Sequence, residues 1–423
     1  MNHLNLWTKI LCVALLFFTA CQKKGGKAEL EQGKLLYQTH CAACHGALGD
    51  GRGPMAGNLF PKPRDLTSGI FKFRTTRGPI PADIDMLQTM KVGIPGSSMP
   101  GWDLLGTREW KAILAYVKSL SPRLAHQAPG PFVEIPQEPK PTADATALGH
   151  QLYIKSGCSA CHGLQGHGDG ASAATLKDVW GQPILPRDLT RGPLKWGNTA
   201  KDIYRTLLLG IPGTPMPSFE NTFAPDQLWN LVHYLQSIKK PLPEGYDASK
   251  PARNLVKVEK IKGDLPVDRQ GDVWTGIKGT PIFLKPLWHE PNSPEWLEVK
   301  ALHNDKEAVF LIRWQDARMD LQVNQSDAVS LQFPREKISS PAELPFLGLG
   351  IASEGIDNYS WEANDPPNSE SKGIYENGVW HVLIKRKLPG EKTGYLSFLL
   401  WDASLPEHSG PEGFSEWMLY ELK

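Results

Sequence analysis

The segments CAACH (residues 41–45) and CSACH (residues 158–162) decide how this chain is organised. Each segment is a CxxCH motif, in which the second of two closely spaced cysteines is followed directly by histidine. A CxxC pair alone could belong to a zinc ribbon, which needs a second CxxC in the same fold, or to a thioredoxin-like site, which needs a βαβ context. Neither context surrounds these segments, so both of these interpretations are disfavoured.

An internal repeat surrounds the two motifs. Copy one covers residues 28–121 and copy two covers residues 145–239, and both contain PRDLT followed by GIPG and a Met-Pro pair. Met99 follows His45 by 54 residues, and Met216 follows His162 by 54 residues. Repeats of this kind indicate a duplicated structural unit.

This duplicated CxxCH motif indicates covalent attachment of two c-type haems. The thiols add to the haem vinyl groups, and the adjacent histidine lies beneath the iron. A methionine in a Gly- and Pro-rich loop can supply the sixth ligand, although a buried methionine is more often a core residue. The matched spacing favours ligation. We therefore predict attachment at Cys41, Cys44, Cys158 and Cys161, with axial ligands His45, Met99, His162 and Met216.

Apolar periodicity gives the fold class, a multidomain α + β chain with two small all-α units followed by an all-β, sandwich-like unit. Three- and four-residue apolar steps predict closing helices in both copies. The chain has 423 residues, 46 Lys+Arg and 45 Asp+Glu, so it is long enough for several domains and its balanced charge does not suggest a nucleic-acid binder. Pro-rich linkers are expected over 122–144 and 240–254, which would leave the copies as separable units.

In residues 255–423 the helical periodicity of apolar residues gives way to short apolar and aromatic runs between turn residues. This pattern is typical of β-strands. We expect these strands at residues 282–287, 308–314, 328–333, 379–384, 395–401 and 417–422.

The first 21 residues have the order of an export signal, with Lys9 before an apolar run that ends at Phe18. Thr19, Ala20 and Cys21 resemble the end of a bacterial lipobox, although Phe18 replaces the usual leucine. We therefore expect a periplasmic protein with a lipid anchor on Cys21. An ordinary cleaved signal with an incidental cysteine is the alternative.

On these motifs, the two copies resemble class I cytochrome c domains. The resemblance implies electron transfer through covalently bound haem. Arg64 and Arg187, both in PRDLT, could pair with haem propionates or form structural salt bridges to the neighbouring aspartates. The resemblance to cytochrome c domains also suggests that Lys and aromatic residues near the haem edge shape a partner surface. These residues are Lys72, Phe73, Lys195 and Trp196.

The stretch from about residue 273 to the end resembles the haem-binding subunit of ethylbenzene dehydrogenase and related molybdenum enzymes of the dimethyl-sulfoxide-reductase group. VFLIRWQDA, VWHVLIKRKL and LSFLLWDAS carry the likeness. In that family a methionine and a lysine hold a b-type haem. Here Leu349 stands where the methionine is expected, and GPEGFSEW lacks the lysine, so a b-type haem is doubtful. Met319, Lys385 and Lys387 are the remaining candidate ligands.

These observations favour an exported di-haem cytochrome c that is an electron-transfer subunit and has no catalytic residues of its own. Its expected partners are the molybdopterin and iron–sulfur subunits of a molybdenum enzyme, with no nucleic acid. A di-haem peroxidase or another small-molecule haem reductase is the enzyme alternative, and it would need an iron with an open coordination position. A third possibility makes the C-terminal unit a sugar-binding or adhesion module.

Overall fold

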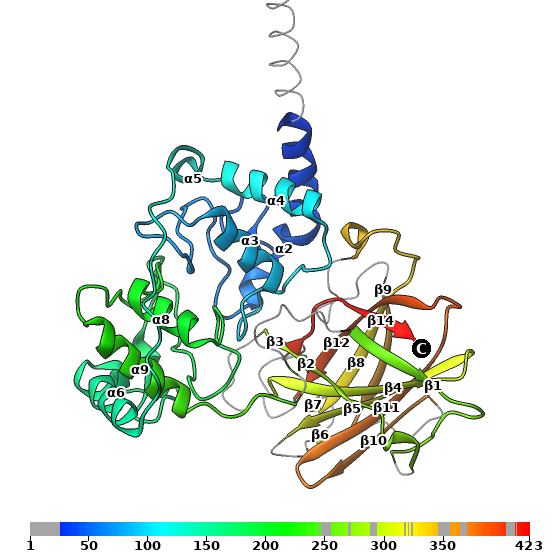
Figure 1. Ribbon diagram of the computed structural model, residues 1–423. Helices are drawn as coiled ribbons and strands as arrows, with labels where there is room; N and C mark the ends of the chain where they lie inside the picture. The colour runs from blue at the N-terminus through cyan, green and yellow to red at the C-terminus, as the bar shows by residue number, and fades with distance from the viewer. Residues whose placement is uncertain are drawn as a thin grey trace, which may run out of the picture.

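A computed structural model describes residues 26–244, 246, 255–269, 272–287, 294–316, 319, 321–322, 325–345, 356–363, 370–402, 411 and 413–423. Two helical units and one β-rich unit make up this part of the chain (Figure 1). The predicted signal over residues 1–21, with Cys21, and the position of Leu349 lie outside the described residues. Within the described ranges, no helix combines the length and apolar character needed to cross a membrane.

The helical units repeat one order of elements. The first contains helical residues 26–40, α2 (Ala42–His45), η1 (Ala56–Asn58), α3 (Asp83–Val92), α4 (Thr107–Ser119) and α5 (Pro122–His126). The second contains α6 (Ala143–Lys155), α7 (Cys158–His162), η2 (Ala173–Thr175), α8 (Ala200–Leu209) and α9 (Pro225–Ser237). This order agrees with the predicted repeat.

Capping groups set the helix ends of the second unit. The Thr142 hydroxyl accepts a hydrogen bond from the Ala145 N–H and begins α6. Thr199 and Asp202 form a capping box at the start of α8, and Gly210, with φ 65°, ends that helix. Each group satisfies backbone polar atoms that the helix leaves unpaired.

The first helix of each unit crosses α4 or α9 at a glycine. A Cβ atom at Gly33 would lie 1.9 Å from the carbonyl oxygen of Ala112, and one at Gly149 would lie 1.9 Å from that of Asn230. Because only glycine permits such a close approach, these positions fix where the helices pack. The crossings bury the predicted apolar stripes of α4 and α9, which comprise Trp110, Ile113, Leu114, Val117, Leu228, Leu231, Val232 and Leu235.

The linker between the helical units contacts both of them. Its middle is extended, as its prolines predict. The Arg77 N–H donates to the Pro131 carbonyl at 2.9 Å, and the Val133 N–H donates to the Thr75 carbonyl at 2.8 Å. Val133 and Ile135 also pack against the second unit's core. An extended chain leaves its backbone N–H and C=O groups free to pair with another segment, as at the edge of a sheet. Here these groups pair with the backbone of the first unit.

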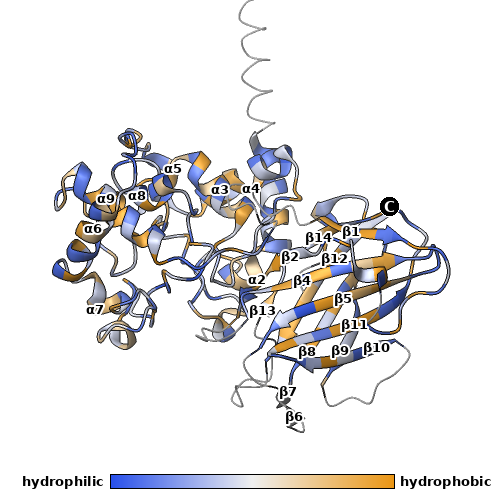
Figure 2. Ribbon diagram, turned by 60° about the horizontal axis from the view of Figure 1, so that its bottom comes forward, coloured by the Kyte–Doolittle hydropathy of each residue, from blue (hydrophilic) through white to orange (hydrophobic). Residues whose placement is uncertain are grey.

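The β-rich unit contains the strands β1 (Leu255–Lys260), β2 (Thr280–Phe283), β3 (Lys285–Pro286), β4 (Trp296–His303), β5 (Glu307–Gln315), β6 (Leu321–Gln322), β7 (Gln325–Ser326), β8 (Ala328–Pro334), β9 (Ile356–Glu362), β10 (Ser371–Glu376), β11 (Val379–Lys387), β12 (Thr393–Trp401), β13 (Gly413–Phe414) and β14 (Met418–Leu422). Two short helices, η3 (Asp272–Trp274) and η4 (Pro341–Glu343), lie between them. Hydrophobic residues are frequent along these strands (Figure 2).

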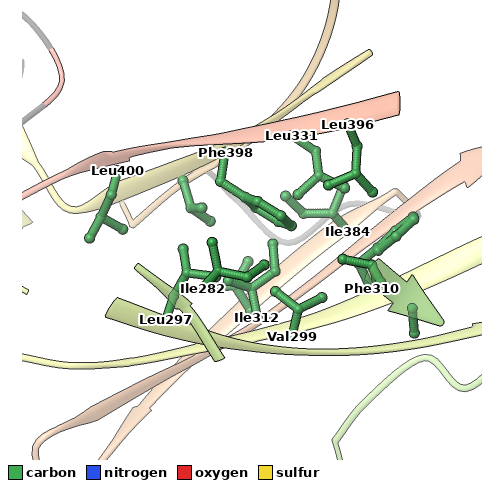
Figure 3. Close-up of a cluster of buried hydrophobic side chains, with 14 of the residues drawn as sticks. Ile282, Leu297, Val299, Phe310, Ile312, Leu331, Ile384, Leu396, Phe398 and Leu400 are labelled. Carbon is green, nitrogen blue, oxygen red and sulfur yellow. The ribbon is translucent and has the colours of Figure 1, made fainter. Parts of the chain in front are cut away.

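Strand β12 joins two layers of strands. One layer runs β10-β11-β5-β4-β1-β14-β12, in which residues 393–396 pair with β14. Residues 397–401 pair instead with β8, which continues to β9, while residues 399–400 also pair with β13. Buried side chains from both layers meet in one core (Figure 3). The sandwich-like prediction agrees with this arrangement.

The strand predictions are confirmed at five of the six positions, and the sixth is divided at Leu284 between β2 and β3. Strands β1, β4, β9 and β10 were not predicted. In β1 and β4, Lys and Glu on the outward face interrupt the apolar run, which hides the strand from a search for continuous apolar residues.

Candidate functional site

The CxxCH motifs form short helices that end sharply. Cys41 is the N-cap of α2, and the His45 N–H donates to its carbonyl at 2.9 Å. Gly46, with φ 79°, ends α2, and Gly163, with φ 76°, ends α7 in the same way. Glycine adopts these angles without strain, so each histidine is the last residue of its helix.

The carbonyl of an arginine orients each predicted iron-binding histidine. Nδ1 of His45 lies 2.9 Å from the Arg64 carbonyl oxygen, and Nδ1 of His162 lies 3.1 Å from that of Arg187. Nδ1 is therefore the protonated nitrogen and Nε2 carries the lone pair. Burial lowers the pKa of both imidazoles, which favours the neutral form that binds metal. The PRDLT repeat thus has a local structural role.

Two tyrosines that the sequence analysis did not single out support the same turns. The Tyr37 hydroxyl donates to the Gly46 carbonyl at 2.8 Å, and the Tyr153 hydroxyl donates to the Gly163 carbonyl at 2.6 Å. Burial raises the pKa of both phenols, so each remains a donor at neutral pH. Their shared place in the repeat, shortly before CxxCH, was the signal available in the sequence.

One cavity brings the four predicted residues of the first site together. Cys41, Cys44, His45 and Met99 all line it, with apolar side chains such as Trp102 around them. Both cysteines are free thiols, and burial raises the pKa of Cys41 to about 12 and that of Cys44 to about 11. The cavity therefore presents two thiols, one imidazole and one thioether to the same apolar space.

Two residues of the second set lie against the core of their own unit. Cys158 and Met216 both pack against that core, and Cys158 and Cys161 are free thiols. The methionine loops close alike: the Ile94 N–H donates to the Met99 carbonyl at 3.0 Å, and the Ile211 N–H donates to the Met216 carbonyl at 3.1 Å.

Four cations gather between the helical units. Arg64 and Lys72 come from the first unit, and Arg187 and Lys195 are their repeat equivalents. Burial is the main cause that lowers the pKa of Lys72, and the positive charges of Lys195 and Arg64 lower it further. Burial, followed by Arg187 and Arg64, lowers the pKa of Lys195 to about 8. These mutual effects show that the four charges share one region, which we call the boundary cluster.

The boundary cluster has some acidic neighbours but leaves buried donors unsatisfied. The negative charge of Asp178 raises the pKa of Arg64, against the effect of burial. Arg187 Nη2 forms an ion pair with Glu295 at 2.9 Å. Arg64 Nη1 and Arg187 Nε are buried without a hydrogen-bond partner among the described protein atoms. Neither arginine pairs with the aspartate of its own PRDLT segment in the described structure. Unsatisfied buried donors of this kind match an anionic ligand such as a haem propionate.

The aromatic residues beside the lysines also lie at the boundary between the units, and the expectation of a partner surface is wrong for Phe73, which is buried. The rings of Phe73 and Trp196 stack with centroids 4.8 Å apart. Phe73 is buried, and Lys72 and Lys195 are only partly accessible. Packing of one copy against the other buries the edges that an isolated copy would expose.

These residues fit a covalently attached haem at both sites. In the first site Cys41 and Cys44 would hold the thioether links, and His45 and Met99 the two axial positions. The second set is Cys158, Cys161, His162 and Met216. Haem c supplies one-electron iron chemistry when bound. The chain's own contributions are the neutral imidazole, the methionine loop and the cations of the boundary cluster.

Comparison with known proteins decides the family of the helical units. The family model for cytochrome c matches residues 30–121 and residues 146–239. These two segments are cytochrome c domains. Cytochrome c domains imply covalently bound haem c and a role in electron transfer.

Two curated relatives match part of this chain. The chain is 28% identical over 208 residues to the cbb3-type cytochrome c oxidase subunit CcoP of Azospirillum sp. (strain B510), covering 43% of this chain and 63% of that protein. It is 19% identical over 208 residues to a candidate respiratory nitrate reductase heme subunit, ORF7, of Haloferax mediterranei, covering 40% of this chain and 73% of that protein. The chain thus spans less than two thirds of the Azospirillum relative's length.

Two solved structures are also similar. A chain of the Kuenenia stuttgartiensis reducing HAO-like protein complex Kustc0457/Kustc0458 is 39% identical, and the match covers 50% of this chain and 96% of that chain with a TM-score of 0.49. A family 9 carbohydrate-binding module from Caldicellulosiruptor kristjanssonii, solved with glucose, is 11% identical, and the match covers 40% of this chain and 95% of that chain with a TM-score of 0.28. Neither TM-score is high enough to support an argument.

The first cytochrome domain shares its cavity with the other two units. Trp180 of the second cytochrome domain and Phe414 of the β-rich unit both line it. The Phe60 N–H also donates to the Leu287 carbonyl at 3.0 Å. Sequence reasoning assigned no part of the first site to these residues, because nothing local to residues 28–121 indicates them.

The candidate b-haem ligands of the β-rich unit are not brought together in a core. Met319 is 48% exposed. Lys385 lies 3.9 Å from Glu307 on the neighbouring strand, and Lys387 is exposed at the end of β11. Such positions are usual for lysines on the hydrated face of a strand. The described part of the chain therefore offers no ligand pair for a third haem at these positions.

Proposed function

We propose that this chain is an exported two-haem electron carrier, anchored to the periplasmic side of the membrane through Cys21, that serves a partner oxidoreductase. One observation carries the proposal: each cytochrome domain holds a complete set of two cysteines, a histidine and a methionine. A histidine and a methionine would both bind the iron of each haem, and such a closed site favours electron transfer over substrate binding.

The boundary cluster supports electron exchange between the two sites. Arg64, Lys72, Arg187 and Lys195 come from both cytochrome domains, and we propose that they bind propionates of both haems. Stacking of Phe73 on Trp196 fills the same boundary with aromatic side chains. This arrangement would keep both cofactors next to one rigid, poorly hydrated interface, in which little reorganisation accompanies charge movement.

The proposed partner is a molybdenum enzyme of the dimethyl-sulfoxide-reductase group, with molybdopterin and iron–sulfur subunits. The resemblance of the C-terminal unit to a haem-binding subunit of such enzymes supports this assignment. Two relatives named as subunits of a cytochrome oxidase and of a nitrate reductase support membership of a redox complex. Metal analysis of the complex purified from membranes tests the assignment: equimolar molybdenum is expected, and a stable redox complex without molybdenum would contradict it.

A reductive titration combined with carbon monoxide tests the carrier function. The protein should take up one electron per haem, two per chain, without binding carbon monoxide stoichiometrically at native pH, because both axial positions are occupied. The same preparation should not turn over hydrogen peroxide. Stoichiometric carbon monoxide binding by the unmodified protein would place the peroxidase-like alternative ahead of the carrier.

A further inference from the structure

The methionine loop of the first cytochrome domain is covered by the β-rich unit. The Ser98 hydroxyl donates to the Pro286 carbonyl at 2.7 Å, and the Gly101 N–H donates to Glu416 Oε1 at 2.6 Å. Ser98 directly precedes Met99, and Gly101 follows it by two residues. Two hydrogen bonds from another unit therefore enclose the predicted iron ligand on both sides.

One corner of the β-rich unit supplies these contacts. Strands β3 and β13 pair antiparallel, with Phe414 opposite Lys285. The Lys285 ammonium lies 3.1 Å from Glu416 Oε1, and the Lys285 side chain is only 7% exposed. Phe414, which is 1% exposed, lines the cavity that holds Met99. The corner thus presents an apolar ring to the cavity and a carboxylate, fixed by a buried lysine, to the loop.

The second cytochrome domain has the same loop without this cover. Pro215 takes the place of Ser98 and has no hydroxyl to donate, and Ser218 takes the place of Gly101. Both residues are exposed, and the Ser218 hydroxyl donates to Leu208 of its own domain at 2.6 Å. The two loops therefore share a backbone fold and differ in what holds them in place.

We propose that Glu416 and Lys285 are positioning residues that hold Met99 at the first haem, which makes the β3–β13 corner part of that redox site. The proposal rests on the proposed function, because it takes Met99 as an iron ligand. A loop that swings outward exchanges its methionine for an external ligand. Hydrogen bonds to Pro286 of β3 and to Glu416, which follows β13, oppose that motion, since the loop must lose them to open. The first site should accordingly hold its methionine more tightly than the second.

Substitution of Glu416 tests this role in the full-length holoprotein. Glu416→Ala removes the acceptor, so one of the two haems should bind carbon monoxide roughly tenfold faster, a factor set by the loss of one charge-assisted hydrogen bond. The sulfur-to-iron charge-transfer band of the oxidised protein should weaken by up to half, with a lower potential for that haem alone. Glu416→Gln keeps an acceptor and should restore most of the band. Ser218→Ala, the matched control on the second loop, should leave the first haem unchanged.

Two further variants, Ser98→Ala and Met99→Ala, cover the cases that Glu416→Ala alone does not distinguish. If Glu416→Ala does not accumulate as a folded protein, Ser98→Ala removes only the hydroxyl contact and should produce a smaller change in the same haem. Unchanged carbon monoxide binding in a folded Glu416→Ala protein would overturn the positioning role, and so would equal shifts in both haems. Where Glu416→Ala does not fold, unchanged carbon monoxide binding in Ser98→Ala would overturn it. Met99→Ala separates the two proposals: loss of half the band with no effect of Glu416→Ala rejects only the positioning role, whereas an unchanged band rejects Met99 as a ligand.

Discussion

Arg64 lies over the indole of Trp180, with its guanidinium carbon 4.5 Å from the ring centroid, so an arginine of the first cytochrome domain packs on the second domain. Arg64 and Arg187 also each approach a glycine of the other domain. A Cβ atom at Gly213 would lie 2.2 Å from Arg64 Nη1, and one at Gly96 would lie 2.8 Å from Arg187 Nη1. Each PRDLT arginine thus reaches the methionine loop of the other domain.

Arg64→Gln should lower the reduction potential of one haem by tens of millivolts, because a cation in a poorly hydrated site stabilises the reduced form. A spectroelectrochemical titration that resolves two waves would measure the shift. Arg77→Gln provides the control, since Arg77 forms a surface ion pair with Glu220 and its side chain is 47% exposed. Unshifted waves in a folded Arg64→Gln protein would argue against propionate binding by this residue.

Replacing Met99 or Met216 by alanine should affect one haem each. The cysteine links remain, so both haems stay attached. The sulfur-to-iron charge-transfer band in the far red should fall by about half in each variant, because two equivalent sites contribute to it. The opened iron should also bind carbon monoxide or cyanide. A band that survives in either single variant would remove that methionine from the ligand set.

Haem stoichiometry should be two covalent haems per chain, from two complete CxxCH motifs. A pyridine haemochrome assay measures the total, and acid-acetone extraction separates covalent from free haem. The double variant Cys41→Ser/Cys44→Ser should retain one covalent haem if the second domain folds independently of the first cofactor. A full equivalent of extractable haem in the unmodified protein would show that a b-type haem is present.

Cys21→Ser should release the protein from membranes, because a diacyl anchor on that cysteine is the predicted attachment. Membrane fractionation after expression with export and haem attachment intact measures the distribution. Cys12→Ser, within the apolar run, serves as the control. Unchanged membrane association and processing in Cys21→Ser would contradict the lipobox prediction.

Stability of the β-rich unit should fall as the pH drops from about 6.5 towards 4, in part because of His381. Burial, then Arg313 and Arg269, lowers the pKa of this histidine to about 4. Between these pH values the unfolded chain binds a proton that the folded chain does not, so acid favours unfolding. His381→Gln should flatten this dependence in denaturant titrations. An identical pH profile in the variant would show that other groups dominate.

The sequence by itself determined the chemistry of both haem sites. CxxCH is a local pattern, since the thiols and the histidine belong to one short segment, and the matched distance to Met99 and Met216 predicts the second ligand within each copy. The cytochrome c match over 30–121 and 146–239 agrees with the predicted repeat. Strands with continuous apolar runs were likewise predictable, because burial on both faces leaves a continuous signal.

Only the tertiary structure decided how the units share these sites. Phe414 lines the cavity of Met99, and Glu416, paired with Lys285, binds the Met99 loop. These residues lie roughly 190 to 320 positions from Met99 along the chain, and no local pattern encodes a contact across that separation. The same limit explains Lys72 and Lys195, which look like surface cations in their own copies and become partly buried where the copies meet. A sequence records which groups each unit contains, whereas packing between units decides which of those groups lose water and which residues from elsewhere complete the site.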